Sequence, residues 1–175
     1  MSRKLIVYIA CSLDGYIAKP NDDLSFLNAV EREGEDYGYA AFKETIDTVI
    51  LGRRTYDWVL EHLKEFHHPD KKAYVLTRQE IADRDNVVFY NGELSALVNG
   101  LKSEEGKDIF CDGGAQVVNQ LLQEGLVDRL IISVIPVVVG GGTKLFMEGI
   151  PERELKLINS LSYESGLVQL QYDIL

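Results

Sequence analysis

The chain has 175 residues, about the size of one domain, so we expect residues 1–175 to form a single domain. Hydrophobic residues make up 46% and charged residues 26%, which excludes a disordered tail, a collagen-like repeat and a disulfide scaffold. The formal net charge of −10 argues against nucleic acid as a partner. A bound phosphate would have to be held locally, by backbone N–H groups and a few cations.

Two cysteines, Cys11 and Cys111, are too few for a disulfide framework or a Cys-based zinc site. We expect both to be small buried side chains in a reducing cytoplasm. The apolar run 5–13 is barely as long as the core of a signal peptide and is assigned to a strand. Because the run 130–139 is far shorter than the ~20 residues of a membrane helix, we expect a cytoplasmic protein with no membrane contact.

Short apolar runs bounded by charge or glycine alternate with segments in which apolar residues recur at i, i+3 and i+4. The runs are typical of strands buried on both faces, and the spaced segments predict helices. In chain order we expect strand 5–10, helix 39–46, strand 48–51, helix 56–63, strands 73–77 and 87–90, helix 94–101, strand 109–111, helix 117–122 and strand 129–139. This order favours an α/β fold with a mostly parallel sheet covered on both faces.

The last twenty residues have a different pattern, because apolar and polar side chains alternate strictly over 168–174. An apolar segment, 155–163, precedes them across a turn at Glu164, Ser165 and Gly166. The sequence therefore predicts an antiparallel hairpin at the C-terminus.

Glycine-rich loops follow several predicted strands, at the edge of the sheet where α/β proteins bind ligands. Gly113 and Gly114 lie between a strand and a helix, where bare backbone lets a pyrophosphate reach the N–H groups and the positive end of the helix dipole. A plain tight turn explains the two glycines equally well. The segment 52–55 repeats the pattern with two arginines, and its Thr55 is either a phosphate ligand or a helix N-cap.

Thr77 and Arg78 add a hydroxyl and a cation at the end of another strand. Two phosphate-type loops and a third cationic strand end predict a dinucleotide with an extra phosphate, NADPH rather than NADH. No GxGxxG motif follows the first strand, so the fold is not a Rossmann fold in the strict sense. The loop 140–144, GGGTK, lacks the residue order of a P-loop. Two interpretations of its glycines are left: the backbone passes close to a ligand, or the loop is a plain connection between strands.

Other catalytic chemistries find little support. His62, His67 and His68 lie near one another, but adjacent side chains point apart in most geometries and charges surround them. We interpret the histidine segment as a solvated loop and expect no metal site. A GxSxG elbow and the zinc deaminase signature are both absent, which argues against hydrolysis and deamination.

Five ordered motifs cover nearly the whole chain: SLDGYIA at 12–18, DTVILGRRTY at 47–56, YVLTR at 74–78, DGGAQVVNQLL at 112–122 and PVVVGGGTKLF at 136–146. Together they resemble the dihydrofolate reductase-like superfamily. The chain is most similar to the branch with the reductase domain of the bifunctional riboflavin-biosynthesis deaminase/reductase and its stand-alone, mostly uncharacterised bacterial relatives. The resemblance implies a three-layer α/β fold with a mostly parallel eight-stranded central sheet and an antiparallel C-terminal hairpin.

The resemblance also implies NADPH and assigns its binding residues by motif position. Backbone contacts to the nicotinamide carboxamide are assigned to Ala10 and Ile17. The first phosphate loop is assigned to Gly52, Arg53, Arg54 and Thr55, and the adenosine 2′-phosphate site to Thr77 and Arg78. The pyrophosphate loop is assigned to Gly113, Gly114, Ala115 and Gln116.

Two aspartates are the candidates on the substrate side. Asp14 matches a substrate-side position of the riboflavin-type reductases, although an Asp before Gly is also a common turn former. Asp36 falls where dihydrofolate reductases carry their substrate-pocket acid, and it is the candidate catalytic acid if its pocket raises its pKa. The alternative for Asp36 is a helix-start carboxylate. The Trp-centred loop of true dihydrofolate reductases is missing between residues 20 and 40, which argues against folate.

The predicted function is an NADPH-dependent reductase that passes a hydride to a small heterocyclic or ribosyl-pyrimidine substrate, as the 5-amino-6-(5-phosphoribosylamino)uracil reductase of riboflavin biosynthesis does. The proton would come from Asp36, Asp14 or water. The alternatives are a dihydrofolate or pterin reductase and a non-catalytic NADPH-binding module. The long apolar strand and the final hairpin offer edges for subunit pairing, so we expect a homodimer.

Overall fold

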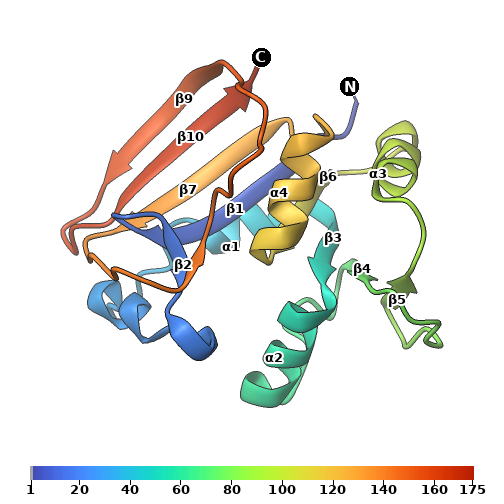
Figure 1. Ribbon diagram of the computed structural model, residues 1–175, viewed down its shortest axis with the longest axis horizontal. Helices are drawn as coiled ribbons and strands as arrows, with labels where there is room; N and C mark the ends of the chain where they lie inside the picture. The colour runs from blue at the N-terminus through green and yellow to red at the C-terminus, as the bar shows by residue number, and fades with distance from the viewer. Residues whose placement is uncertain (1) are drawn as a thin grey trace.

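An eight-stranded sheet runs through the molecule, and helices pack on both of its faces (Figure 1). The computed structural model describes residues 2–175. Its elements in chain order are β1 (Leu5–Ser12), β2 (Tyr16–Ala18), the 3₁₀ helices η1 (Pro20–Asp22) and η2 (Ser25–Val30), α1 (Tyr39–Glu44), β3 (Ile46–Gly52), α2 (Arg53–Leu63), β4 (Lys72–Leu76), β5 (Val87–Tyr90), α3 (Leu94–Ser103), β6 (Asp108–Gly113), α4 (Ala115–Gln123), β7 (Arg129–Ile135), β8 (Thr143–Lys144), β9 (Leu155–Ser162) and β10 (Val168–Ile174).

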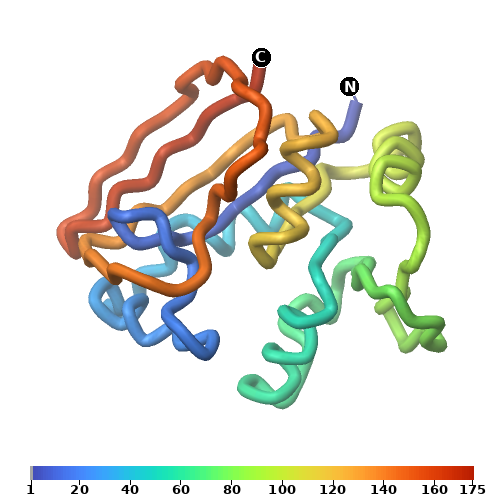
Figure 2. The backbone as a smooth tube through the Cα atoms, viewed as in Figure 1, coloured from blue at the N-terminus to red at the C-terminus, as the bar shows by residue number. Residues whose placement is uncertain are grey.

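The strand order of the large sheet is β5-β4-β3-β6-β1-β7-β10-β9. Neighbouring strands from β5 to β7 are parallel, whereas β10 is antiparallel to both β7 and β9. Figure 2 shows the red hairpin of β9 and β10 at the edge of the sheet on the side away from the yellow-green helix α3. The predicted mostly parallel eight-stranded sheet with an antiparallel C-terminal hairpin is confirmed.

The two faces of the sheet carry separate cores, which makes the fold three-layered. In β6, Ile109 and Cys111 point toward the core that α3 and α4 cover, and Phe110 points toward α1 and α2 on the opposite face. All three are at most 1% exposed. Burying a side chain as large as Phe110 contributes about 1.5–3 kcal/mol, so the apolar runs of these strands stabilise both helix layers at once.

Most predicted elements are present, with two kinds of difference. The predicted strand 129–139 ends earlier, at Ile135, because Pro136 has no N–H for a ladder hydrogen bond. The sequence analysis also missed β2, β8, η1 and η2. The short strands β2 and β8 pair with each other in a second, two-stranded sheet. Within residues 2–175, no helix is long and apolar enough to cross a membrane.

Both cysteines are core residues, as expected. Cys11 is 5% exposed and Cys111 is fully buried. Burial raises the pKa of the Cys111 thiol to about 12, and it also raises the pKa of the Cys11 thiol. Neither thiol is therefore ionised near neutral pH, which argues against a nucleophilic role for either.

Candidate active site

A cavity of about 1650 Å³ opens where β1, β3, β4 and β6 end at the same edge of the sheet. Parallel strands place their carboxyl ends together, so loops that are far apart in sequence meet there. Every residue predicted to bind the cofactor lines this cavity, except Gly113, which is buried at the end of β6. The structure thus brings four predicted loops into one site.

Two helices begin at the cavity, and both begin without a side-chain cap. Gly52 precedes α2 and Gly114 precedes α4. Since no side chain accepts from the first-turn N–H groups, these donors remain available to an anion. Thr55 lies in the third position of α2, so the N-cap alternative for Thr55 is wrong.

The two glycine loops also pack on each other. A Cβ atom at Gly52 would lie 3.2 Å from Val117 Cγ2, and one at Gly114 would lie 3.2 Å from Thr55 Oγ1. A side chain at either position would push the loops apart and cover the backbone N–H groups. Glycine at these two positions therefore leaves the N–H groups open to a phosphate-bearing cofactor, whereas a larger residue would not.

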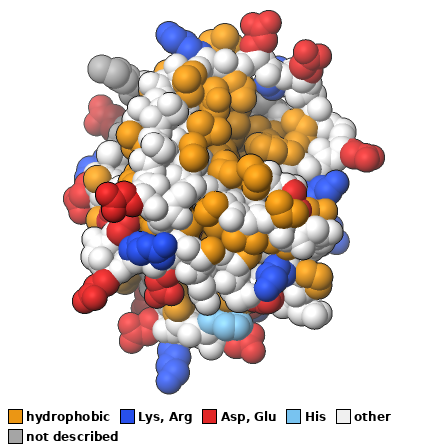
Figure 3. All heavy atoms as spheres, turned by 90° about the vertical axis from the view of Figure 1, so that its left-hand side faces the viewer, with side chains coloured by type: hydrophobic (Ala, Val, Ile, Leu, Met, Phe, Trp, Pro, Cys, Tyr) orange, Lys and Arg blue, Asp and Glu red, His pale blue; other side chains and the backbone are white. Residues whose placement is uncertain are grey.

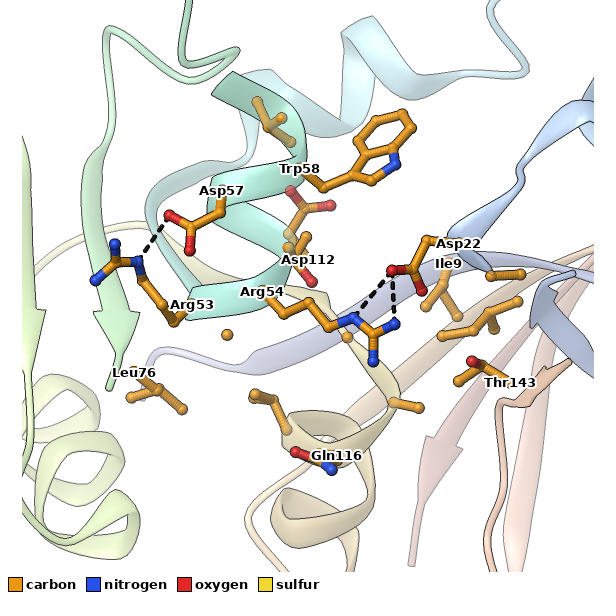
Figure 4. Close-up of a pocket in the computed structure, with 18 of the residues that line it drawn as sticks. Ile9, Asp22, Arg53, Arg54, Asp57, Trp58, Leu76, Asp112, Gln116 and Thr143 are labelled. Carbon is orange, nitrogen blue, oxygen red and sulfur yellow. Dashed lines mark hydrogen bonds and ion pairs between the residues drawn. The ribbon is translucent and has the colours of Figure 1, made fainter. Parts of the chain in front are cut away.

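Three arginines lie at this cavity, and they differ in their partners. Figure 4 shows two of them, Arg53 and Arg54, each beside a carboxylate. Arg54 binds Asp22 with two nitrogens, at 2.6 and 2.9 Å, and Arg53 Nε donates to Asp57 at 2.7 Å. Arg78 is exposed and makes no ion pair within residues 2–175. An incoming phosphate would compete with two carboxylates for Arg53 and Arg54, whereas Arg78 is free to bind one.

The GGGTK loop forms a wall of the same cavity through Gly142, Thr143 and Lys144. Gly142 has φ +124°, and a Cβ atom there would lie 2.1 Å from the carbonyl oxygen of Ala18. The close approach is therefore to the backbone of another chain segment, and it permits the pairing of β2 with β8.

Asp14 lines neither this cavity nor the smaller one beside it, and its carboxylate bonds to two loops. Its carboxylate accepts hydrogen bonds from Ser12 Oγ at 2.6 Å, Gly140 N at 2.7 Å and Val139 N at 3.0 Å. These bonds, the one from Ser12 foremost, lower the pKa of Asp14 to about 2. The contact of Asp14 with substrate stays a prediction. The turn-forming alternative is supported by these hydrogen bonds from Ser12, Val139 and Gly140.

A second cavity, of about 290 Å³, shares Tyr8, Ile9, Ala10, Leu27 and Asp112 with the first. Asp36 lines it, and its carboxylate accepts hydrogen bonds from Gly38 N and Ala40 N, both at 2.9 Å. These bonds lower the pKa of Asp36. The raised pKa expected of a catalytic acid is thus not found, because backbone donors at the start of α1 stabilise the ionised carboxylate.

The histidine loop differs most from the prediction. His68 is fully buried, and the rings of His67 and His68 lie 3.9 Å apart at their centroids. His67 Nε2 lies 2.8 Å from Asp112 Oδ2. The interpretation as a solvated loop is therefore wrong, because the loop folds inward onto the end of β6. The sequence analysis missed Asp112, although its place at a strand end directly before Gly113 and Gly114 is a signal for it.

The cluster of His67, His68 and Asp112 lies between the two cavities, since Asp112 lines both. Burial raises the pKa of Asp112, but the two imidazoles outweigh burial, and the net pKa is lowered. Burial also lowers the pKa of His68, so this ring is neutral near pH 7. An ionised carboxylate and a neutral imidazole therefore meet beneath the cavity.

The sheet order and a site at the carboxyl edge define a dihydrofolate reductase-like fold. The dihydrofolate reductase of Enterococcus faecalis complexed with NADP(H) superimposes with a TM-score of 0.65 at 18% identity, covering 99% of each chain. At this identity the likeness concerns the fold alone.

The chain belongs to the RibD C-terminal domain family, whose model matches residues 3–169. The uncharacterized protein YwjB of Bacillus subtilis is 43% identical over 173 residues, covering 98% of both chains. The crystal structure of a putative riboflavin biosynthesis protein from Shewanella sp. PV-4 has a TM-score of 0.90 at 29% identity, covering 100% of this chain and 99% of that one. The family predicted from the five motifs is confirmed.

Proposed function

We propose that the protein is an NADPH-dependent reductase that transfers a hydride to a small heterocyclic, ribosyl-pyrimidine-type substrate. The observation that carries this proposal is the convergence of the predicted cofactor residues on one cavity with two uncapped helix N-termini. Membership of the RibD C-terminal domain family supports a reductase of this kind. The fold shared with a dihydrofolate reductase complexed with NADP(H) supports the choice of cofactor.

In this proposal the bare backbone at Gly52 and Gly114 holds the cofactor's phosphates through the N–H groups of α2 and α4. Arg78, which makes no ion pair with a carboxylate among residues 2–175, binds the 2′-phosphate. Ala10 and Ile17 position the nicotinamide, because Ala10 lies where the two cavities meet. The bound cofactor supplies the hydride.

The smaller cavity is the proposed substrate site. Tyr8, Tyr37, Tyr39 and Phe110 line it, and aromatic faces suit a flat heterocycle. Asp14, Asp36 and Asp112 all have lowered pKa values, so none of them is a proton donor near neutral pH. Water therefore delivers the proton that follows the hydride, and the protein contributes mainly by positioning the two reactants.

The test is a calorimetric titration of NADPH and NADH into protein stripped of carried-over ligand. We expect tight NADPH binding and weak NADH binding. Arg78→Gln should remove about 1.5–3 kcal/mol from NADPH binding, the worth of a charged hydrogen bond, and leave NADH binding unchanged. Arg84→Gln, an exposed arginine outside the cavity, is the control. Equal affinity for the two cofactors, or no binding of either, would contradict the proposal.

A second measurement separates a reductase from a non-catalytic binding module. Oxidation of NADPH should depend on an added pyrimidine or pterin compound and should be absent without one. If NADPH binds but none of these compounds is reduced, the chain is a binding module for the cofactor.

A further inference from the structure

Two side-chain nitrogens and a carboxylate oxygen converge beneath the proposed active site. Each of His67, His68 and Asp112 offers one ligand atom, and the three atoms lie within 4.8 Å of one another. His67 and His68 belong to the loop between α2 and β4, whereas Asp112 lies near the end of β6. The fold therefore assembles the cluster from two distant segments.

Hydrogen bonding within the cluster is incomplete. His68 is fully buried, yet neither of its ring nitrogens has a hydrogen-bond partner among residues 2–175, and His67 Nδ1 also lacks one. His68 Nε2 lies 3.4 Å from Asp112 Oδ2 without hydrogen-bond geometry. An unsatisfied buried polar group costs about 1–3 kcal/mol, so the arrangement is unfavourable unless something occupies it.

We propose that His67, His68 and Asp112 bind one divalent transition-metal ion, for which Zn²⁺ is the probe. Metal–ligand distances of about 2.0–2.2 Å in a tetrahedron place neighbouring ligand atoms about 3.4 Å apart. The Nε2 atoms of His67 and His68 lie 2.8 and 3.4 Å from Asp112 Oδ2. A small opening of the His67–Asp112 contact would accommodate the ion. Two imidazoles and one carboxylate suit Zn²⁺, Fe²⁺ or Co²⁺ rather than Mg²⁺ or Ca²⁺.

The loop that carries the histidines is held in place before any ion binds. The His68 carbonyl oxygen accepts hydrogen bonds from Asn86 Nδ2 at 2.8 Å and from Lys71 N at 3.3 Å. Lys43 Nζ donates to the His67 carbonyl oxygen at 3.3 Å. The His68 ring packs edge-on against Phe110. Preorganised ligands lose little conformational freedom on binding, which favours a site here.

The charged groups around the cluster do not exclude a cation. Asp112 is the carboxylate in contact with both histidines. Lys43 is a nearby cation, and its charge disfavours a metal ion. The lysine bonds to the backbone of the loop and not to a ligand atom, so it does not block the site.

A metal ion at this position would keep an open coordination site. His67 and Asp112 line the large cavity, and Asp112 also lines the small one, so the fourth ligand would come from the cavity. Structural zinc sites have four protein ligands, whereas sites with three protein ligands bind water or substrate in the fourth position. The proposed ion would thus bind an oxygen atom of water or of the substrate. This inference does not depend on the identity of the cofactor.

The experiment titrates Zn²⁺ into the full chain after its metal has been removed with a chelator. We expect one zinc ion per chain, a higher Tm on binding and, with Co²⁺ in place of zinc, the intense visible absorption of a four-coordinate ion. His67→Gln and Asp112→Asn should each weaken Zn²⁺ binding at least about tenfold, since replacing a residue that only hydrogen-bonds to a metal ligand already has an effect of that size. His62→Gln is the control, because His62 is exposed and stacks on Trp58 away from the cluster.

These variants keep the proposal testable even if replacing the buried His68 prevents folding. Unchanged zinc affinity in both His67→Gln and Asp112→Asn would overturn it, because binding would then come from the acidic surface. Absence of stoichiometric binding would overturn it as well. The titration uses neither NADPH nor a substrate, so its failure is distinct from a failure of the proposed reductase activity.

Discussion

The Asp36 carboxylate accepts hydrogen bonds from the backbone N–H groups of Gly38 and Ala40 at the start of α1. These donors stabilise the ionised form, and the pKa of Asp36 is lowered in the folded protein. Because the folded-state pKa lies below the unfolded value, the contribution of Asp36 to stability is present above the unfolded pKa. It is lost as the pH falls through the folded value. Asp36 therefore undergoes no titration near neutral pH.

We expect Asp36→Asn to retain turnover of NADPH within about twofold, because an ionised carboxylate donates no proton and the amide oxygen still accepts from one of the two backbone N–H groups. The dependence of kcat on pH between 5 and 9 should also be unchanged. Steady-state rates of the two proteins with one reducible substrate check this. A fall of about a hundredfold, the usual contribution of a general acid, would restore the catalytic role predicted from the sequence.

At the scale of elements, the pairing of β2 with β8 closes one wall of the cavity. The pairing depends on Gly142, where a Cβ atom would lie 2.1 Å from Ala18 O and 2.9 Å from Lys19 Cα. Gly141, the preceding residue, has open space around its Cα and an ordinary backbone conformation. The two adjacent glycines therefore form a matched pair for substitution.

Gly142→Ala should lower the free energy of unfolding by at least about 2 kcal/mol, because the methyl group meets backbone atoms that cannot move aside cheaply. Gly141→Ala should stay within about 1 kcal/mol of the parent. Urea denaturation of the three proteins measures both differences. Gly142→Ala should also weaken NADPH binding, since Ala18 and Thr143 line the cavity. Equal stability of the two variants would show that the β2–β8 contact tolerates rearrangement.

The elements found from the sequence share a physical feature, and so do those that were missed. Strands β5 and β10 matched their predicted ranges, and β1 and β9 were close, because each has a run of apolar or alternating residues long enough to show a period. Strands β2 and β8 have three and two residues, too few for any period. The 3₁₀ helix η2 packs through Phe26 and Val30 without a helical pattern of its own.

The residues of the candidate site also divide into those that the sequence pattern indicates and those that it does not. The loops that line the large cavity could be found from the sequence, because each one combines glycines or arginines with a strand end. The cluster of His67, His68 and Asp112 was not, because 44 positions separate His68 from Asp112 and only the tertiary fold joins them. Adjacent histidines also gave a misleading signal, since the irregular backbone between α2 and β4 turns both rings inward.

At the scale of the molecule, the sheet ends in an edge strand with an apolar surface. Strand β9 is the last in the sheet order, and Leu155 and Leu157 lie opposite Ile174 and Tyr172 of β10. Leu155, Leu157, Ile158 and Val168 are 38–53% exposed, and we call them the apolar edge. Figure 3 shows hydrophobic side chains gathered on this side of the molecule. Exposed apolar patches beside an unpaired strand usually mark an interface.

A second copy of the chain is the expected partner for the apolar edge, because a two-fold axis would bury the same patch on both subunits. Sedimentation equilibrium at micromolar concentration should therefore give twice the mass of the chain. Leu157→Lys should shift the equilibrium to monomer, since a lysine of each subunit would then have to be buried in the apolar interface. Leu63→Lys on α2 is the control, because Leu63 is 55% exposed and Leu157 is 53% exposed. A parent protein that sediments only as monomer would contradict the homodimer, and dissociation by both variants would place the interface elsewhere.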